Sequence, residues 1–258
     1  MSLYHHTQGE GPAVVLLHGW GMHGGVWDDV VQALCTRFRV TVLDLPGHGR
    51  STLPPEGFTL EAAAEAIAAA VPQPAVWVGW SLGGMLATRI ASRHPAKVRA
   101  LSLVASSPRF VQAEDWPHAL PPEILAQFAG ELANDYRATV DRFVALQAMG
   151  SRSANMEIRT LRTRLFRHGE PAPEALRGGL SILQTADLRA ELKHLSCPVQ
   201  AILGRLDTLT PARLGAALSQ LKPGIETHIM PGAAHCPFLS HTREFLELLE
   251  GFLDRHAG

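Results

Sequence analysis

The chain has 258 residues, of which 46% are hydrophobic and 18% are charged, and its formal net charge is -1 at pH 7. This length suffices to bury a large core, either as one α/β domain or as one domain that carries an insertion. A net charge so close to zero gives no overall attraction to nucleic acid or to a membrane surface, so we expect neither as a partner.

Both the N-terminal residues and the cysteines favour a cytoplasmic protein. Residues 1–6 lack the basic and then apolar pattern of a signal peptide, and no apolar run approaches the length of a transmembrane helix. Cys35, Cys197 and Cys236 are odd in number and far apart, and they form no C-x-x-C pair. We therefore expect reduced, mostly buried thiols in a cytoplasmic monomer, rather than disulfides or a zinc site.

Predicted strands and helices alternate in the first part of the chain. Short apolar runs predict strands that are buried on both faces of a sheet, at residues 14–17, 38–44, 76–79 and 98–104. Residues 59–71 carry apolar side chains at helical spacing, with Thr59 as a candidate N-cap, and a second helix is expected over 85–91. This alternation predicts a parallel, doubly wound sheet.

The pattern changes between residues 109 and 188, where no stretch is a convincing strand. Apolar residues there recur at helical spacing, which predicts helices at residues 122–132, 134–149, 153–168 and 174–185. The α/β pattern then resumes, with strands and helices expected at residues 199–203, 211–221, 227–230 and 244–253. We therefore predict an α/β core of residues 1–108 and 189–258, with residues 109–188 inserted as a helical cap.

The segment Gly79-Trp80-Ser81-Leu82-Gly83 follows a predicted strand and precedes a predicted helix. This strand, sharp turn and helix match the G-x-S-x-G nucleophile elbow, which exposes a reactive serine. A β-carbon at Gly79 or Gly83 would collide with the neighbouring backbone, so the two glycines permit the tight, strained turn. The motif predicts Ser81 as a nucleophile.

A serine hydroxyl barely ionises at neutral pH, so it needs a base, and the base needs an orienting acid. In this arrangement the acid and then the histidine follow the nucleophile along the chain. Asp207 and His235 each come just after a predicted strand, at the sheet edge where ligands bind in open α/β sheets. The rival acids fit less well, because Asp187 precedes its strand and Asp44 precedes the nucleophile.

The oxyanion of an acyl-transfer reaction also needs hydrogen-bond donors. One donor in this fold is the backbone amide after the nucleophile, here that of Leu82, and the other comes from the loop after the first core strand. That loop begins His18-Gly19-Trp20, so we predict the Trp20 amide as the second donor. His5, His6, His118 and His168 have no ligand-like spacing with other possible ligands, and no metal or organic cofactor is expected.

Taken together, these motifs resemble the α/β-hydrolase family over essentially the whole chain. A narrower resemblance is to the family of pimeloyl-acyl-carrier-protein methyl ester esterases of biotin synthesis. It is carried by Trp20, Trp80 and the stretches 104–108, 116–117, 142–150 and 178–183. The resemblance implies a serine carboxylesterase whose substrate is the methyl ester of a pimeloyl chain on acyl carrier protein, with that protein as a partner.

The resemblance also implies site residues in core and cap. Substrate contacts carry over onto Trp20, Ser81, Leu82, Phe143, Val144, Ala145, Leu146, Gln147 and His235. Family arginines that grip the acidic carrier protein carry over onto Arg142 and Arg159. The chain departs from the family at Ala138 and Asn155, where further arginines are expected, although Arg137 and Arg152 are nearby.

The charge pattern of the cap leaves two interpretations open. Residues 151–168 contain five arginines against one acid, Glu157. This run is either a solvated basic face or a surface that attracts an acidic partner. The alternative activities for the same motifs are a general short-chain esterase or thioesterase and a C–C bond hydrolase, and the non-enzymatic alternative is a binding protein that keeps the fold.

Overall fold

A single mostly parallel sheet runs through the computed structural model, which describes residues 2–151, 153–165 and 167–258. In that part of the chain the sheet has seven strands in the order β1-β3-β2-β4-β5-β6-β7. Their bounds are β1 (His5–Gln8), β2 (Ala13–Leu17), β3 (Arg39–Leu43), β4 (Ala75–Trp80), β5 (Val98–Val104), β6 (Val199–Gly204) and β7 (Glu226–Met230). The predicted parallel α/β sheet is confirmed.

One strand was not expected. β1 pairs antiparallel with β3 at the edge of the sheet, and every residue of its sequence His-His-Thr-Gln is exposed. Such an edge strand buries no apolar face, so the sequence gives no alternation of apolar and polar residues to reveal it. The central strand β4, by contrast, is buried at every residue and lies between β2 and β5.

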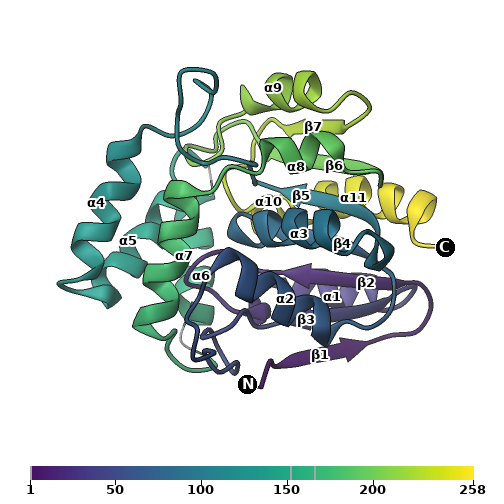
Figure 1. Cartoon of the computed structure of the whole chain (residues 1–258), viewed down its shortest axis with the longest axis horizontal. Helices are drawn as coiled ribbons and strands as arrows, with labels where there is room; N and C mark the ends of the chain where they lie inside the picture. The colour runs from purple at the N-terminus through teal and green to yellow at the C-terminus, as the bar shows by residue number, and fades with distance from the viewer. Residues whose placement is uncertain (1, 152, 166) are drawn as a thin grey trace.

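Helices cover both faces of the sheet (Figure 1). On one face, consecutive contacts join α2 (Leu60–Ala70), α3 (Leu82–Arg93), α8 (Arg189–His194) and α9 (Leu214–Leu221). On the other face, α1 (Asp28–Leu34) packs against α11 (Thr242–His256), which follows the single turn α10 (Pro237–Ser240). The hydroxyl of Thr59 accepts a hydrogen bond from the amide of Ala62, so Thr59 caps α2 as predicted.

The remaining helices stand between β5 and β6 in the sequence, beyond the end of the sheet toward which β2 points (Figure 1). They are α4 (Pro122–Leu132), α5 (Tyr136–Gln147), α6 (Ala154–Leu165) and α7 (Pro173–Thr185). All four had been predicted, although α6 ends earlier than expected, at Leu165. The division into core and cap at residues 108 and 188 stays a prediction.

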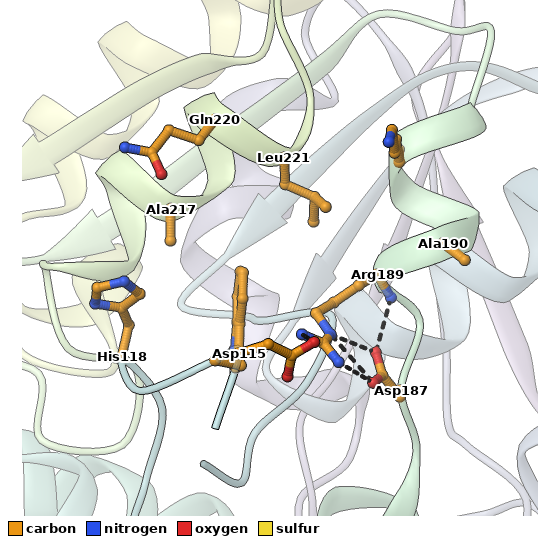
Figure 2. Close-up of a pocket in the computed structure, with 10 residues that line it drawn as sticks. Asp115, His118, Asp187, Arg189, Ala190, Ala217, Gln220 and Leu221 are labelled. Carbon is orange, nitrogen blue, oxygen red and sulfur yellow. Dashed lines mark hydrogen bonds and ion pairs between the residues drawn. The ribbon is translucent and has the colours of Figure 1, made fainter. Parts of the chain in front are cut away.

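The chain leaves the sheet after β5 and returns before β6 at almost the same place. The amide of Leu188 donates to the carbonyl of Pro108 at 2.8 Å. Arg109 forms an ion pair with Asp187. Arg189 forms ion pairs with both Asp187 and Asp115 (Figure 2). The hydrogen bonds from Arg189 hold the pKa of Asp187 well below its usual range. The rival acid Asp187 is therefore committed to a structural ion-pair cluster.

A hollow of about 490 Å³ opens beside this cluster, between α8, α9 and the segment around His118 (Figure 2). It is lined by charged and apolar residues together, and Ser81, Asp207 and His235 are not among its lining residues.

In the described ranges no helix has both the length and the apolar character needed to cross a bilayer. Of the three free thiols expected to be mostly buried, Cys236 is fully buried, Cys35 and Cys197 are half-buried, and none of them is exposed.

Candidate active site

Ser81 occupies the turn between β4 and α3 with a backbone φ of 54°. A residue other than glycine in that left-handed region is strained, and close backbone contacts around the turn hold Ser81 in it. A β-carbon at Gly79 would lie 2.4 Å from the carbonyl oxygen of Gly83, and one at Gly83 would lie 2.6 Å from that of Leu17. The two glycines therefore let strand, turn and helix come into direct backbone contact.

The end of the neighbouring strand β5 holds the turn at Ser81 in place and contains a second strained residue. Ala105, directly after β5, also has a positive φ, of 43°. The next residue, Ser106, donates its hydroxyl to the carbonyl of Ser81 at 2.7 Å, while the amide of Ser81 donates to Val104 at 3.0 Å. The elbow is thus fixed from the neighbouring strand. We had assigned no role to Ser106, and the residues 104–108 that carry part of the family resemblance were the available signal.

Asp207 and His235 meet at the ends of β6 and β7. The carboxylate of Asp207 accepts a hydrogen bond from Nδ1 of His235 at 2.8 Å, and both side chains are buried. The other carboxylate oxygen accepts from the amides of Leu209, at 2.8 Å, and Thr210, at 2.9 Å, and the hydroxyl of Thr210 also donates to the carboxylate. The acid is therefore held in one orientation and can orient the imidazole.

This pairing determines which nitrogen of His235 is free to act as a base. With Nδ1–H committed to Asp207, Nε2 is the proton acceptor, and it is buried without a hydrogen-bond partner among the described residues. The ring lies beside Trp80, the residue before Ser81, at a centroid separation of 5.7 Å. Within those residues no hydrogen bond joins Nε2 to the hydroxyl of Ser81; such bonds commonly tighten only when substrate is bound.

The two predicted oxyanion donors belong to segments that touch at Ser81. A β-carbon at Gly19, the residue before Trp20, would lie 3.2 Å from the β-carbon of Ser81. In the described chain the amides of Trp20 and Leu82 donate to no other protein group. Leu82 also begins α3, and the first amides of a helix carry partial positive charge. Two unpaired donors are therefore available beside the nucleophile.

A buried, neutral histidine, His18, holds the predicted oxyanion loop against the neighbouring turn. His18 donates from Nδ1 to the carbonyl of Gly19 and accepts at Nε2 from the amide of Leu45, both at 2.8 Å. Burial lowers the pKa of His18 to about 3 and that of the neighbouring His48 to about 4. Only the neutral imidazole of His18 can make both bonds, since the cation has no acceptor nitrogen. Our sequence analysis assigned no role to these two histidines.

The rival acid Asp44 belongs to the same structural network. Burial raises its pKa, but hydrogen bonds from Arg50 and the amide of Gly24, together with the neighbouring His18, outweigh that effect and the pKa falls to about 2. Asp44 also accepts from the amide of Gly24 at 2.7 Å. The segment from Asp44 to Ser51 therefore builds a turn, and both carboxylate oxygens of Asp44 already accept hydrogen bonds within it.

The predicted substrate contacts on α5 divide between two sides of the helix. Phe143, Val144 and Gln147 are buried, and the ring of Phe143 lies 4.8 Å from that of Trp20. Ala145 and Leu146 instead line an apolar hollow of about 450 Å³ between α4, α5 and α6. The structure therefore brings Phe143 to the predicted oxyanion loop but places Ala145 and Leu146 in a different hollow.

The predicted docking arginines have contrasting surroundings. Arg142 forms an ion pair with Glu131 and borders the same apolar hollow. Arg159 lines a separate hollow of about 470 Å³ on α6 and has no ion-pair partner among the described residues. The other arginines of residues 151–168 that the structure describes pair with Asp141, Asp29 and Asp28. Much of the basic run is thus neutralised within the chain, and Arg152 lies outside the described residues.

Known structures share this architecture. Residues 14–248 match the alpha/beta hydrolase family. The chain superposes on the esterase from Exiguobacterium antarcticum with a TM-score of 0.89 at 19% identity, over 98% of this chain and 95% of that one. The bromoperoxidase from Bacillus anthracis gives 0.88 at 24% identity, over 98% and 95%. These two likenesses show the fold alone, and the family match shows that the chain belongs to the alpha/beta hydrolases.

Sequence relatives narrow the family. A protein of Methylococcus capsulatus named pimeloyl-acyl-carrier-protein methyl ester esterase is 46% identical over 255 residues, 98% of this chain and 99% of its own. A protein of the same name from Yersinia enterocolitica is 44% identical over 251 residues, 97% and 96% of the two chains. Such identity over nearly the full length places the chain in the family of these esterases, as its sequence resemblance indicated.

The buried histidines predict a loss of stability in mild acid. Because burial lowers the pKa of His48 from 6.5 to about 4 in the folded state, the unfolded chain binds the proton more tightly. The stabilising contribution is complete above about pH 6.5 and falls toward pH 4 by about 1 kcal/mol per pH unit. Urea unfolding of His48→Gln between pH 7 and 5 should show a shallower pH dependence than the parent chain. The exposed His5→Gln should keep the parent slope, and equal slopes for all three would contradict this explanation.

The Asp207–His235 hydrogen bond predicts the cost of removing the acid. In Asp207→Asn the amide cannot orient the same imidazole tautomer, so kcat for an ester substrate should fall on the order of 10⁴-fold, as in serine proteases. Asp187→Asn is the matched control, because that acid belongs to the ion-pair cluster and should leave kcat close to the parent value. Steady-state kinetics with a p-nitrophenyl ester measures both. A larger loss for Asp187→Asn would make it the catalytic acid.

Proposed function

We propose that this chain is a serine carboxylesterase that hydrolyses the methyl ester of pimeloyl-acyl carrier protein to the free pimeloyl acid and methanol in biotin biosynthesis. The observation that carries the proposal is the 44–46% identity to esterases of that name over almost the whole length of both chains. The buried Asp207–His235 pair beside the strained serine turn supplies the chemistry that such a hydrolysis needs.

The mechanism follows from the assigned roles. His235, oriented by Asp207, accepts the proton of the Ser81 hydroxyl as its oxygen attacks the ester carbonyl. The amides of Trp20 and Leu82 stabilise the negative oxygen of the tetrahedral intermediate. Methanol then leaves with the proton from His235, and water hydrolyses the acyl-enzyme by the same route. None of these steps requires a metal or an organic cofactor.

The surroundings of the serine suit an alkyl chain. Trp20, Leu82 and Phe143 are buried, and the first and last of these pack against each other. A β-carbon at Gly179 on α7 would lie 2.7 Å from the ring of Trp20 and 3.2 Å from Leu82, so α7 closes over both. Apolar walls of this kind favour the methylene chain of a pimeloyl group over a polar acyl group.

The carrier protein is proposed to dock on the cap. Acyl carrier proteins are acidic in the family that the chain resembles, and Arg142 and Arg159 are the cap positions that match its docking arginines. Both guanidinium groups lie at the surface, Arg142 on α5 and Arg159 on α6. Surface charges of opposite sign accelerate association. We infer further that the protein acts as a monomer in the cytoplasm, which its free thiols support.

The nucleophile assignment is tested by Ser81→Ala with the natural class of substrate. Without the hydroxyl no acyl-enzyme forms, so release of methanol from pimeloyl-carrier methyl ester should fall to background. Ser219→Ala, at an exposed serine of α9, is the control and should keep parent activity. Mass spectrometry of the carrier-bound product measures both. Turnover by Ser81→Ala would refute the mechanism.

Substrate identity requires a separate outcome. The parent chain should restore growth without biotin to an auxotroph that lacks this esterase, whereas Ser81→Ala should not. Robust hydrolysis of simple esters without restored growth would instead favour a general short-chain esterase.

The docking surface predicts a selective effect on the carrier-bound substrate. Arg142→Glu and Arg159→Glu should raise KM for pimeloyl-carrier methyl ester severalfold, more at low salt, because each replaces attraction to an acidic partner by repulsion. KM for a small p-nitrophenyl ester should not change. Arg243→Glu reverses a charge on α11, away from the cap, and serves as control. Equal KM changes for all three variants, or none, would contradict docking at these arginines.

A further inference from the structure

Trp80 is the last residue of β4 and directly precedes Ser81. It is fully buried, and its indole touches both loops that complete the site. On one side, a β-carbon at Gly19 of the oxyanion loop would lie 3.0 Å from its six-membered ring. On the other, its ring lies 5.7 Å from that of His235 and 5.1 Å from that of Phe238. One side chain therefore separates the oxyanion loop from the histidine loop.

The indole also makes a directed bond to the histidine. Nε1–H of Trp80 donates to the main-chain carbonyl of His235 at 2.9 Å, in a buried environment. The amide of His235 donates to the carbonyl of Gln147, at the end of α5, at 3.1 Å. With Nδ1 bound to Asp207, the residue is thus fixed at its amide, its carbonyl and its ring. Of these three restraints, the one from Trp80 comes from the residue bonded to Ser81.

We propose that Trp80 is a positioning residue for the reaction: its indole N–H holds the main chain of His235 at a set distance from Ser81. The proposal rests on the proposed roles of Ser81 and His235. Trp80 is adjacent to Ser81 at the end of β4. A hydrogen bond from its indole to the main chain of His235 therefore fixes the distance between Ser81 and His235. A shift of about 1 Å in such a separation can cost on the order of 10² in rate.

A purely structural role for Trp80 has a matched comparison in the same strand. Trp77 is also fully buried, and its Nε1–H donates to the carbonyl of Lys97 at 2.9 Å. Its acceptor lies at the other end of β4, beside the start of β5. Removal of either indole therefore creates a similar cavity and leaves one carbonyl without its partner, which destabilises the fold in both cases. Only removal of the Trp80 indole takes away one of the three restraints on His235.

The experiment compares Trp80→Phe and Trp77→Phe with the parent chain. For Trp80→Phe we expect kcat for a p-nitrophenyl ester to fall about 10- to 100-fold with KM changed much less, because the interaction acts on the reacting groups and not on substrate binding. The rate of serine labelling by a fluorophosphonate should fall in parallel. Trp77→Phe should lose comparable thermal stability but keep kcat.

A second variant removes the donor without a cavity. The benzothienyl analogue of tryptophan, introduced at position 80 alone, puts sulfur in place of the N–H and preserves shape, so it tests the bond even if Trp80→Phe fails to fold. It should lower kcat in the same way. Parent kcat in the analogue, or an equal loss of kcat in Trp77→Phe, would overturn the proposal. Ser81→Ala separates failure of the Trp80 proposal from failure of the proposed function. Turnover by that variant would show that Ser81 is not the nucleophile, whatever Trp80 does.

Discussion

The left-handed backbone at Ser81 is the constraint on which the rest of the site depends. A side chain held at a φ of 54° costs on the order of 1–3 kcal/mol, so the surroundings must enforce it. They do so by bringing backbones together at glycines and by the hydrogen bond from Ser106. The result is a hydroxyl presented at the junction of a strand end and a helix start, beside the amides of Trp20 and Leu82 that we propose as oxyanion donors.

Buried histidines near Ser81 have two different kinds of partner. Burial keeps His18 and His48 neutral, and a hydrogen bond from His18 to the carbonyl of Gly19 fixes the loop that carries Trp20. His235 is equally buried, but the carboxylate of Asp207 lies against its Nδ1 and can stabilise an imidazolium of the kind that the proposed mechanism forms. The partners of a buried histidine therefore decide its role here: His18 bonds to a main-chain carbonyl and a main-chain amide, whereas the carboxylate beside His235 suits the proposed catalytic role.

How far the sequence predicts this molecule depends on the range of the contacts involved. The elbow and the strands that precede Asp207 and His235 are short-range patterns, so their order along the chain sufficed to assign them. Ser106 gave no such signal, because its bond to Ser81 exists only once β4 and β5 pair in register. The two sides of α5 were likewise not separable, since helical spacing shows which residues share a face but not what packs on it.

The contact between Pro108 and Leu188, where the chain leaves the sheet and returns to it, has a consequence for the segment between them. The hydrogen bond between Pro108 and Leu188 brings the two ends of the intervening segment together, so a segment of another length could also connect β5 to β6. A different segment between these two residues would change what covers this end of the sheet, while the strands that precede Ser81, Asp207 and His235 would keep their pairing. A successful replacement must still offer one carbonyl where that of Gln147 now receives the amide of His235.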